Sequence, residues 1–505
     1  MRGAKLVRPS FVLLVILLAA LFARIYQLDT EDLWVDEAIA VSISSNSLGG
    51  LLEASLPDGN PPLYYVLLHY WMWLFGDSEF SVRLPSALFG LCSVAMMYKV
   101  GCTLFGKGTG LIAALILALS VYHIFYSQEA RTYSMMVLLA LISYYFFLRL
   151  LEGEDYKVLA GYVLSTTALM YSHHYGLFFV IAQTLFLLGF YSLKRRRERA
   201  PSLKMWALAG GAVATLYIPG FLYLAYPLTH PEHRGWIEDT VPMITQLDLV
   251  SVLHTYAVYA QAPGLRAPKY YFALLMLFAA ASAVALAASK GERGKLYLLS
   301  LWLLVPIALP LLLSQIVTPL VHARYSIAAL PAFYLLAAEG IKRVGRVAMR
   351  PLTNGQVPLA ALCVIVIVFL IMAFSSLDVL HRYFTTEKKE PWRTVVGDVK
   401  PQAKRDDLFI ISPELSRFPF DYYASREAFF QEAQEVSLDD REQANEVGSV
   451  ASGSDRVWLV LQTGDDNEKE QFKAELEKAA FEVRTHKSYP VTHQYGIDLM
   501  LFEKK

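Results

Sequence analysis

Two adjacent carboxylates stand early in the chain, in the stretch Leu33-Trp34-Val35-Asp36-Glu37-Ala38. They follow the first apolar segment, where a membrane-spanning chain would leave the bilayer. A paired acid in such a loop is ordinary, because loops between spans are polar. Two further polar stretches, Pro57–Tyr65 and Ser127–Tyr133, also carry acids beside possible partners. We expect the three loops to converge on one catalytic pocket in which a carboxylate takes a proton.

The composition is that of a membrane protein. Of 505 residues, 55% are hydrophobic and 18% are charged, which is too much apolar surface for a soluble chain to bury. The net charge is zero, so nothing in the bulk composition indicates nucleic-acid binding. Cys92, Cys102 and Cys363 all lie in apolar segments, which argues against a disulfide framework or a zinc site.

The N-terminus could be mistaken for a cleaved signal peptide. Arg2, Lys5 and Arg8 precede an apolar run that ends near Ala23 among small residues. Because many further apolar segments follow, we favour an uncleaved first helix.

A spanning helix needs about 20 mostly apolar residues. This rule predicts eleven spans, at residues 10–28, 83–104, 109–126, 132–151, 157–172, 175–193, 204–224, 270–289, 296–314, 324–341 and 357–376. The fifth and sixth are nearly continuous and are separated at Ser172–Gly176.

Basic residues are concentrated in alternate connections between these spans. The richer set comprises Arg2, Lys5, Arg8, Lys99, Lys107, Arg149, Lys157, Lys194–Arg199, Lys290, Arg293, Lys295, Lys342, Arg343, Arg346 and Arg350. By the positive-inside rule these connections are cytoplasmic. The prediction is a multi-pass cell-membrane protein with a cytoplasmic N-terminus. The Asp36 loop and residues 377–505 then lie outside the cytoplasm.

One apolar run does not fit as a span. Leu63–Phe75 has about 13 residues, and a crossing there would invert every later loop. We therefore predict a helix in the outer interface, where Trp71 and Trp73 are well placed. Residues 38–56 could form a second such helix, and the outer loop 225–269 could contain a third, near 243–260.

The composition changes at Leu377, where Lys and Glu become frequent. Short strand-like runs occur at 407–412, 456–462 and 497–502, and residues 468–480 show helical periodicity. The prediction is a transmembrane domain at 1–376, with a catalytic outer loop at 29–82, followed by a soluble extracytoplasmic α/β domain at 377–505. That domain contains no nucleotide-binding loop and no metal-ligand spacing.

The order of these motifs resembles the GT-C glycosyltransferases, in particular the protein-mannosyltransferase and aminoarabinose-transferase branch. The resemblance covers the membrane part and is densest in residues 30–135. Besides Asp36-Glu37, it rests on Pro61-Pro62-Leu63-Tyr64-Tyr65, Phe75-Gly76-Asp77, Arg83-Leu84-Pro85-Ser86-Ala87, Ser127–Tyr133 and Arg324-Tyr325 followed by Leu330-Pro331. Asn60 stands where protein mannosyltransferases commonly have a His, which leaves the acceptor class open.

The resemblance implies a polytopic α-helical fold and an inverting transfer of a hexosyl or pentosyl group. The donor would be a polyprenyl-phosphate sugar, and the acceptor a glycan, lipid or protein on the outer face. Asp36 would be the general base for the acceptor hydroxyl. A solvated loop acid or a helix N-cap is the simpler reading of Asp36. Glu37 could orient Asp36 or raise its pKa, or could only stabilise a helix N-terminus.

Asp58, Glu129 and Arg131 form a second group of candidates. Glu129 could bind a sugar hydroxyl or share a divalent metal ion with Asp58, although carboxylates alone do not specify a metal. Arg131 could face the donor phosphate, or could pair with Glu129 at the membrane edge.

Other candidates for substrate binding are His322, Arg324, His173, His174 and Tyr64. An arginine suits a phosphate because its planar donor fork can bind two oxygens. Arg324 could instead extend from a helix end to the interface. The two neighbouring histidines could be structural, and Tyr64 could pack at the interface or support a sugar.

Two other functions remain open. A transporter or flippase of lipid-linked saccharides would favour ionisable residues in mid-span and inverted repeats, whereas here the acids lie in outer loops. An oligosaccharyltransferase-like enzyme would share the architecture, but residues 377–505 contain no Trp-Trp-Asp-type signature.

Overall fold

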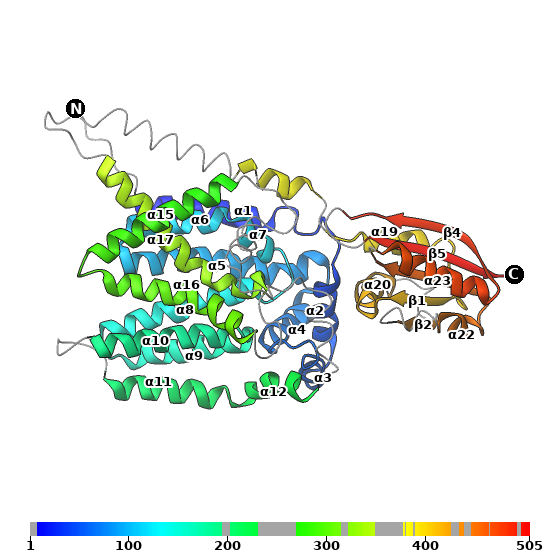
Figure 1. The fold of residues 1–505 in the computed structure, drawn as a ribbon, viewed down its shortest axis with the longest axis horizontal. Helices are drawn as coiled ribbons and strands as arrows, with labels where there is room; N and C mark the ends of the chain where they lie inside the picture. Colours follow the sequence, from blue (N-terminus) through cyan, green and yellow to red (C-terminus); the bar gives the residue numbers. More distant parts are fainter. Residues whose placement is uncertain are drawn as a thin grey trace. The chain divides into compact units, whose positions relative to one another are not determined.

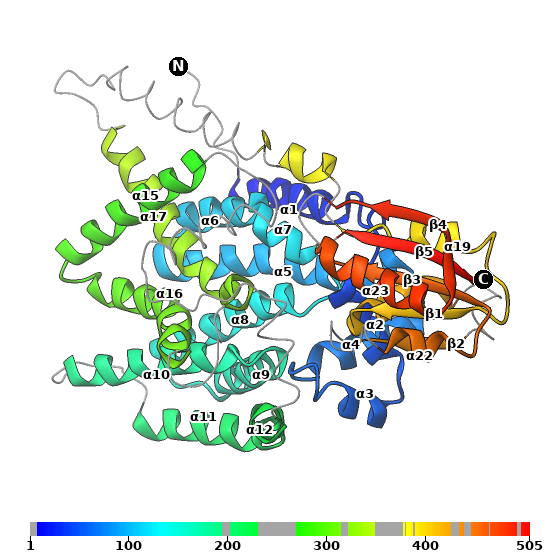
Figure 2. The same cartoon turned by 45° about the vertical axis from the view of Figure 1, so that its right-hand side comes forward.

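The computed structural model describes residues 8–193, 202–230, 269–314, 322–348, 377–378, 380–386, 389–425, 434–438, 446–463, 465–491 and 496–505. The chain divides into two compact units (Figures 1 and 2). Unit 1 comprises Met1–Tyr26, Ser47–Trp71 and Arg83–Phe384, and unit 2 comprises Gln27–Asn46, Met72–Val82 and Thr385–Lys505. Unit 2 therefore includes the Asp36 loop together with the C-terminal part.

Unit 1 is a bundle of apolar helices. Its described elements are α1 (Pro9–Ile25), α3 (Leu48–Ala54), α4 (Leu63–Phe75), α5 (Glu79–Phe105), α6 (Lys107–Leu119), α7 (Val121–Ser127), α8 (Tyr133–Glu152), α9 (Tyr156–Ser172), α10 (Gly176–Leu193), α11 (Leu203–Leu216), η1 (Ile218–Gly220), α12 (Phe221–Thr229), α15 (Lys269–Ala288), α16 (Arg293–Leu313), η3 (Ala323–Ala329) and α17 (Leu330–Ala348). The first residues of α5 and the last of α4 belong to unit 2. Large aromatic side chains fill the core, where Tyr144 and Trp302 stack with ring centroids 3.6 Å apart.

The predicted count of eleven spans is not confirmed. Three described helices are long and apolar enough to cross a membrane, namely α5, α8 and α16. The number rises to five if each of two bent helix pairs is one span. Three more apolar helices are too short by the same measure, and the predicted span at 357–376 lies outside the described residues. The sequence windows were right about where helices occur, but they could not reveal bends.

The predicted span 109–126 is two helices, α6 and α7, which meet at Ser120 with a bend of 62°. Ser120 caps α7, because its hydroxyl accepts a hydrogen bond from the backbone N–H of His123. On the other side of the bend, the buried Arg24 guanidinium donates to the carbonyls of Leu117 and Ala118, at 3.2 and 3.3 Å. Arg24 thus satisfies carbonyls that the bend takes out of the helical ladder.

The short helix at 63–75 is confirmed as α4, with the predicted bounds. Its last turn carries exposed apolar side chains, including Trp73, which is 78% exposed. The predicted helix at 38–56 is two helices, α3 and, in unit 2, α2 (Val35–Ser45). The predicted helix near 243–260 lies outside the described residues.

Unit 2 contains a five-stranded sheet with the order β2-β1-β3-β5-β4. Its strands are β1 (Leu408–Ser412), β2 (Gln434–Ser437), β3 (Arg456–Gln462), β4 (Phe481–Tyr489) and β5 (Ile497–Lys504). Its other elements besides α2 are α19 (Trp392–Val399), η4 (Glu414–Ser416), α20 (Arg417–Ala424), α22 (Val447–Ala451) and α23 (Asp466–Lys478). The three strand-like runs and the helical run of the sequence correspond to β1, β3, β5 and α23. Every residue of β1 is buried, as expected of a strand covered on both faces.

The early loop segments are held to the C-terminal part of unit 2 by polar contacts. Arg393 donates its backbone N–H to Asp32, at 2.8 Å, and its guanidinium contacts Glu79, also at 2.8 Å. The Tyr423 hydroxyl accepts the backbone N–H of Leu33 at 2.9 Å. These contacts position the helix start that carries Asp36.

Candidate functional site

In unit 1, Asp58 lies at the centre of a hydrogen-bonded loop. Its Oδ2 accepts from the Asn60 amide at 2.8 Å and from the Tyr65 hydroxyl. Its Oδ1 lies 3.9 Å from an Arg131 guanidinium nitrogen. Both charged side chains are nearly buried, at 9% and 4% exposure. The turn that begins with Pro57 therefore presents a fixed carboxylate to Arg131.

Arg131 is positioned by the backbone around it. The α7 helix ends at Ser127, and the chain turns so that the Arg131 N–H donates to the Glu129 carbonyl at 2.8 Å. Ser86 of α5 donates to the Arg131 carbonyl at 3.1 Å, and Ser86 in turn bonds the Tyr64 hydroxyl at 2.9 Å. Tyr64 is only 2% exposed, so the structure gives it a supporting position in this network.

Arg324 lies within a group of aromatic rings at the start of η3. Its guanidinium carbon is 5.7 Å from the centre of the Tyr133 ring and 5.5 Å from that of Tyr325. The His173 ring centre is 5.0 Å from that of Tyr325, and the His322 ring centre 5.5 Å. Ring faces stabilise a cation at such distances. Loops that are far apart in the sequence thus meet around one arginine.

The histidines of this cluster are uncharged at neutral pH. Burial is the main cause that lowers the pKa of His173 and His322, with the nearby Arg324 adding to it, and it lowers that of His174 to about 4. The Nδ1 atoms of His173 and His322 accept backbone N–H groups of Tyr175 and Arg324, which places the ring proton on Nε2. The positive charge of the cluster therefore comes from its arginines.

Glu129 completes the cluster. Its side chain is 1% exposed, and both it and Arg324 act electrostatically on the Tyr126 hydroxyl. Arg131 and Arg324 act together on His173. Asp58 therefore pairs with Arg131, and the buried Arg131, Arg324 and Glu129 all lie near the His173 or Tyr126 side chain.

A divalent metal between Asp58 and Glu129 does not fit this arrangement. The oxygens of Asp58 face Arg131, Tyr65 and Asn60. Within the part of the chain that the structure describes, no three His, Cys, Asp or Glu side chains are placed to hold one metal ion. We therefore derive no chemical step through a metal.

Asp36 and Glu37 lie in unit 2, in the first turn of α2. The N-cap of that helix is Trp34, so the simpler reading of Asp36 as an N-cap is wrong. Asp36 is partly exposed, whereas Glu37 is fully buried and its Oε2 lies 2.7 Å from the Lys389 ammonium. Glu37 thus has a buried counter-ion besides its place at a helix N-terminus.

Glu390 was missed by the sequence analysis. It follows Lys389, is 3% exposed, and accepts from the Gln462 amide at 2.8 Å. Its other oxygen, Oε2, is buried and has no hydrogen-bond partner among the described residues. Burial, with a smaller contribution from the charge of Asp36, raises the pKa of Glu390 to about 7. Lys389 thus contacts Glu37, and Glu390 lies near the charge of Asp36. These two dipeptides are about 350 residues apart in the sequence, so no single motif reveals their contact.

The predicted site residues are thus divided between the two units. Asp58, Tyr64, Glu129, Arg131, His173, His174, His322 and Arg324 belong to unit 1, and Asp36 and Glu37 to unit 2. The single pocket that would combine them stays a prediction.

Comparisons with known proteins agree with the resemblance stated above. Residues 59–223 match the family model of dolichyl-phosphate-mannose-protein mannosyltransferases. The mannosyltransferase-like protein YycA of Bacillus subtilis (strain 168) is 31% identical over 150 residues, which are 27% of this chain and 21% of YycA. YkcB of the same organism is 32% identical over 121 residues, 22% of this chain and 16% of YkcB. These alignments span only about a fifth of the relatives' own length.

Solved structures show the same fold over nearly the whole chain. ArnT from Cupriavidus metallidurans in the apo state has a TM-score of 0.59 and 12% identity, covering 97% of this chain and 98% of ArnT. Its structure bound to undecaprenyl phosphate gives 0.57 and 11%, with the same coverage. The fold is therefore that of the GT-C membrane glycosyltransferases with a small C-terminal sheet, and the resemblance to that class is confirmed.

Proposed function

We propose that this protein is an integral-membrane inverting glycosyltransferase that uses a polyprenyl-phosphate-linked sugar. The buried pair of arginines in unit 1, Arg131 and Arg324, is the observation that carries the proposal. Two guanidinium groups in a membrane bundle suit the phosphate of a lipid carrier, because each planar guanidinium can donate two parallel N–H groups to two phosphate oxygens. The fold shared with ArnT, which has been solved with undecaprenyl phosphate, supports this substrate class.

We propose a single displacement at the anomeric carbon. Asp36 takes the proton of the acceptor hydroxyl, and the oxygen attacks the anomeric carbon of the sugar. The bond from that carbon to the phosphate oxygen breaks, and the polyprenyl phosphate leaves with the electron pair. Arg131 and Arg324 stabilise the charge that develops on the leaving phosphate. Attack opposite the leaving group inverts the anomeric configuration.

The segments of unit 2 support the proposed orientation. Residues 27–46, 72–82 and 385–505 form one compact unit, which supports placing them on the same side of the membrane. With that placement, the segment 47–71, which contains α3 and most of α4, would start and end on one side. This supports α4 as an interfacial helix. The Asp36 loop and the C-terminal sheet would then both lie on the outer face, where the acceptor is.

The test is transfer by the full-length protein in proteoliposomes. Undecaprenyl phosphates carrying different labelled sugars are supplied with membrane glycan, lipid and protein acceptors. We expect one donor to be consumed and an inverted product to form, and Asp36→Asn to lower turnover at least 100-fold. Asp29→Asn, in the same loop, is the control and should retain activity.

Two results would contradict the proposal. Undiminished turnover by Asp36→Asn would remove Asp36 as the base. Movement of intact lipid-linked sugar across the bilayer without transfer would indicate a flippase instead.

A further inference from the structure

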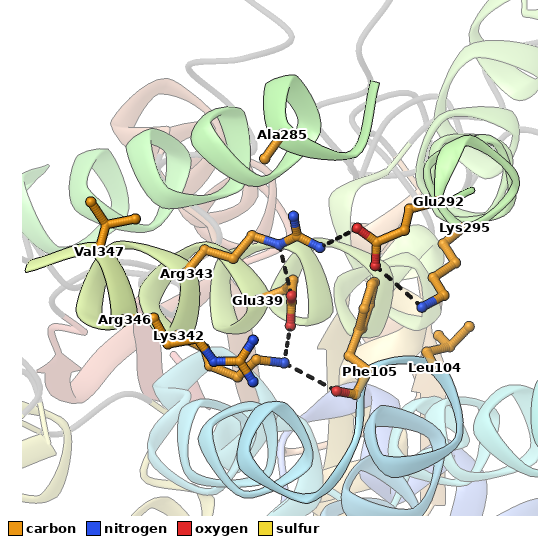
Figure 3. A pocket seen from close by; sticks show the side chains of 10 residues that line it. All are labelled: Leu104, Phe105, Ala285, Glu292, Lys295, Glu339, Lys342, Arg343, Arg346 and Val347. Carbon is orange, nitrogen blue, oxygen red and sulfur yellow. Dashed lines mark hydrogen bonds and ion pairs between the residues drawn. The ribbon is translucent and has the colours of Figure 1, made fainter. Parts of the chain in front are cut away.

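A second polar site lies at the other end of the helices from Arg324. An open cavity of about 530 Å³ is lined by the end of α5, the second half of α17, the end of α15 and the start of α16 (Figure 3). The helix α8 is long and apolar enough to cross a membrane, and its first residue, Tyr133, lies beside Arg324. In the second half of α8, the Tyr145 ring centre lies 5.8 Å from the Lys99 ammonium of α5, the helix whose last residues line the cavity. We therefore assign the cavity to the membrane surface opposite Arg324.

The cavity has an excess of positive charge. Its charged lining consists of four cationic and two acidic side chains: Lys295, Lys342, Arg343, Arg346, Glu292 and Glu339. Two positive charges therefore remain after the acids are matched. All four cations belong to the connections that the positive-inside rule assigns to the cytoplasmic side.

The ion pairs fix the frame of the cavity. Arg343 bridges Glu339 and Glu292, at 2.7 Å each, and Figure 3 shows it between the two carboxylates. Lys342 pairs with Glu339 and also donates to the Phe105 carbonyl at the end of α5, at 3.0 Å. These contacts preorganise the site without neutralising it.

Arg346 remains available for a ligand. It lies one turn after Lys342 on α17, lines the cavity and is exposed. Among the residues that the structure describes, no ion pair or hydrogen bond engages its guanidinium. Lys295 is also partly open, because its ammonium lies 3.5 Å from Glu292 and is 36% exposed.

The remaining wall is apolar. Phe105 and Val347 are among its side chains, and the Lys295 ammonium lies 5.1 Å from the centre of the Phe105 ring. A site with cations on one wall and hydrocarbon on the other, at the ends of membrane helices, matches a molecule with a phosphate and an acyl part. Basic pockets between membrane helices bind acidic lipid headgroups for this reason.

We propose that this cavity binds the phosphate of an anionic phospholipid in the leaflet opposite the glycosyl-transfer site. Arg346 and Lys295 supply the contacts to the phosphate, and the Arg343–Glu339–Glu292 bridge holds them in place. None of these residues takes part in the proposed glycosyl transfer, so lipid binding at the cavity does not depend on which donor or acceptor the protein uses.

Native mass spectrometry of the full-length protein from mixed phosphatidylglycerol and phosphatidylcholine nanodiscs tests this site. We expect wild-type protein to retain phosphatidylglycerol selectively. Arg346→Ala should weaken retention about fivefold, and Arg346→Ala with Lys295→Ala about twentyfold, since each cation near a membrane surface contributes about that factor. Arg149→Ala removes a cation from the end of α8, outside the cavity, and should leave retention unchanged.

Neither substitution removes Arg343, so the frame and the fold are kept. Equal retention by wild type and the double variant would overturn the proposal, as would equal retention of both lipids. Binding of inorganic phosphate that Arg346→Ala weakens, without selective retention of phosphatidylglycerol, would show that free phosphate, not a lipid headgroup, is the ligand and would overturn the proposal. Loss of glycosyl transfer with lipid binding intact would bear only on the proposed enzyme function.

Discussion

The Lys389 ammonium lies 2.7 Å from the Glu37 carboxylate, and both side chains are buried in unit 2. This ion pair connects the helix start that carries Asp36 to the segment leading into α19. The residue beside each partner is also acidic: Asp36 precedes Glu37, and Glu390 follows Lys389. The proposed base is therefore located by a buried pair rather than by a loose surface loop.

Lys389→Met is expected to destabilise unit 2 by about 3–5 kcal/mol, because it leaves the Glu37 charge buried without its cation. Thermal unfolding of the full-length protein in detergent measures this loss. Lys487→Met is the matched control, since its pair with Asp398 is exposed and should contribute less than about 1 kcal/mol.

Adding Glu37→Gln to Lys389→Met should recover part of the loss, because the unpaired charge is then removed. Equal stability of Lys389→Met and wild type would show that the pair is not needed to hold α2.

Glu390 predicts a pH dependence of stability. Its pKa is about 7 in the folded protein against about 4.5 when exposed, so folding favours the protonated form. Below about pH 4.5, Glu390 does not change the free energy of unfolding. As the pH rises from 4.5 to 7, Glu390 lowers the free energy of unfolding, and this loss is complete above pH 7. The full effect is about 3 kcal/mol.

Glu390→Gln should therefore lose less stability than wild type when thermal unfolding is compared at pH 5 and pH 8. The Asp421–Glu435 pair, whose pKa values are also raised mainly by burial, contributes equally to both proteins. Glu414→Gln, at an exposed position, should behave as wild type. Parallel curves for Glu390→Gln and wild type would contradict the assignment.

Arg24→Met should destabilise unit 1 by about 1–3 kcal/mol. It removes the buried donor to the Ala118 carbonyl, and an unsatisfied buried group costs about that much. The Leu117 carbonyl loses one donor but keeps the backbone N–H of Ser120, at 3.4 Å. Unfolding temperature and monodispersity in detergent measure the effect. Phe22→Leu, at an exposed position of the same helix, is the control.

Arg24→Lys retains the charge but lacks the forked donors, so its stability should fall between those of wild type and Arg24→Met. If Arg24→Met unfolds like the Phe22→Leu control, the bend at Ser120 does not depend on the arginine.

Arg324→Ala should raise the KM for the polyprenyl-phosphate donor about 10- to 100-fold and leave the KM for the acceptor within twofold. A lost charge-assisted hydrogen bond accounts for about 1.5–3 kcal/mol. Steady-state kinetics with each substrate varied separately gives both values. Arg382→Ala removes an exposed arginine and should change neither. An unchanged donor KM would argue against contact with the phosphate.

The sequence predicted most apolar helices of unit 1, the helix α23 and three of the strands, because apolar windows and strand-like runs are local signals. It did not predict the short helices α19, α20 and α22. Leu63–Phe75 was predicted to the residue, since Pro61-Pro62 and Gly76 mark its two ends. The bend at Ser120 is not predictable from its own window, because the Arg24 guanidinium that donates to its carbonyls lies in a different helix. The β2 and β4 strands were missed because β2 is short and the middle of β4 is exposed and polar.

The candidate site was predictable by residue type but not by partner. Asp58, Glu129, Arg131 and Arg324 are predicted from residue type as charges in outer loops. The structure pairs Asp58 with Arg131 and surrounds Arg324 with the rings of Tyr133 and Tyr325. The role of Lys389 and Glu390 was hidden, because a Lys-Glu dipeptide in a charged segment is indistinguishable from a solvated surface. Their roles become visible only from their contacts with Glu37 and Gln462, which the structure provides.

Unit 2 is built from segments at both ends of the chain, and this has a consequence for biogenesis. The helix that carries Asp36 leaves the ribosome early, but the residues that cover it, 385–505, are made last. Until synthesis and membrane insertion of residues 83–384 are complete, α2 has neither Lys389 nor α20 to pack against. Pairing across such a sequence separation is slow and leaves apolar surface exposed meanwhile. A truncated chain that ends before residue 385 would therefore lack the residues that hold the Asp36 segment, Lys389 and α20.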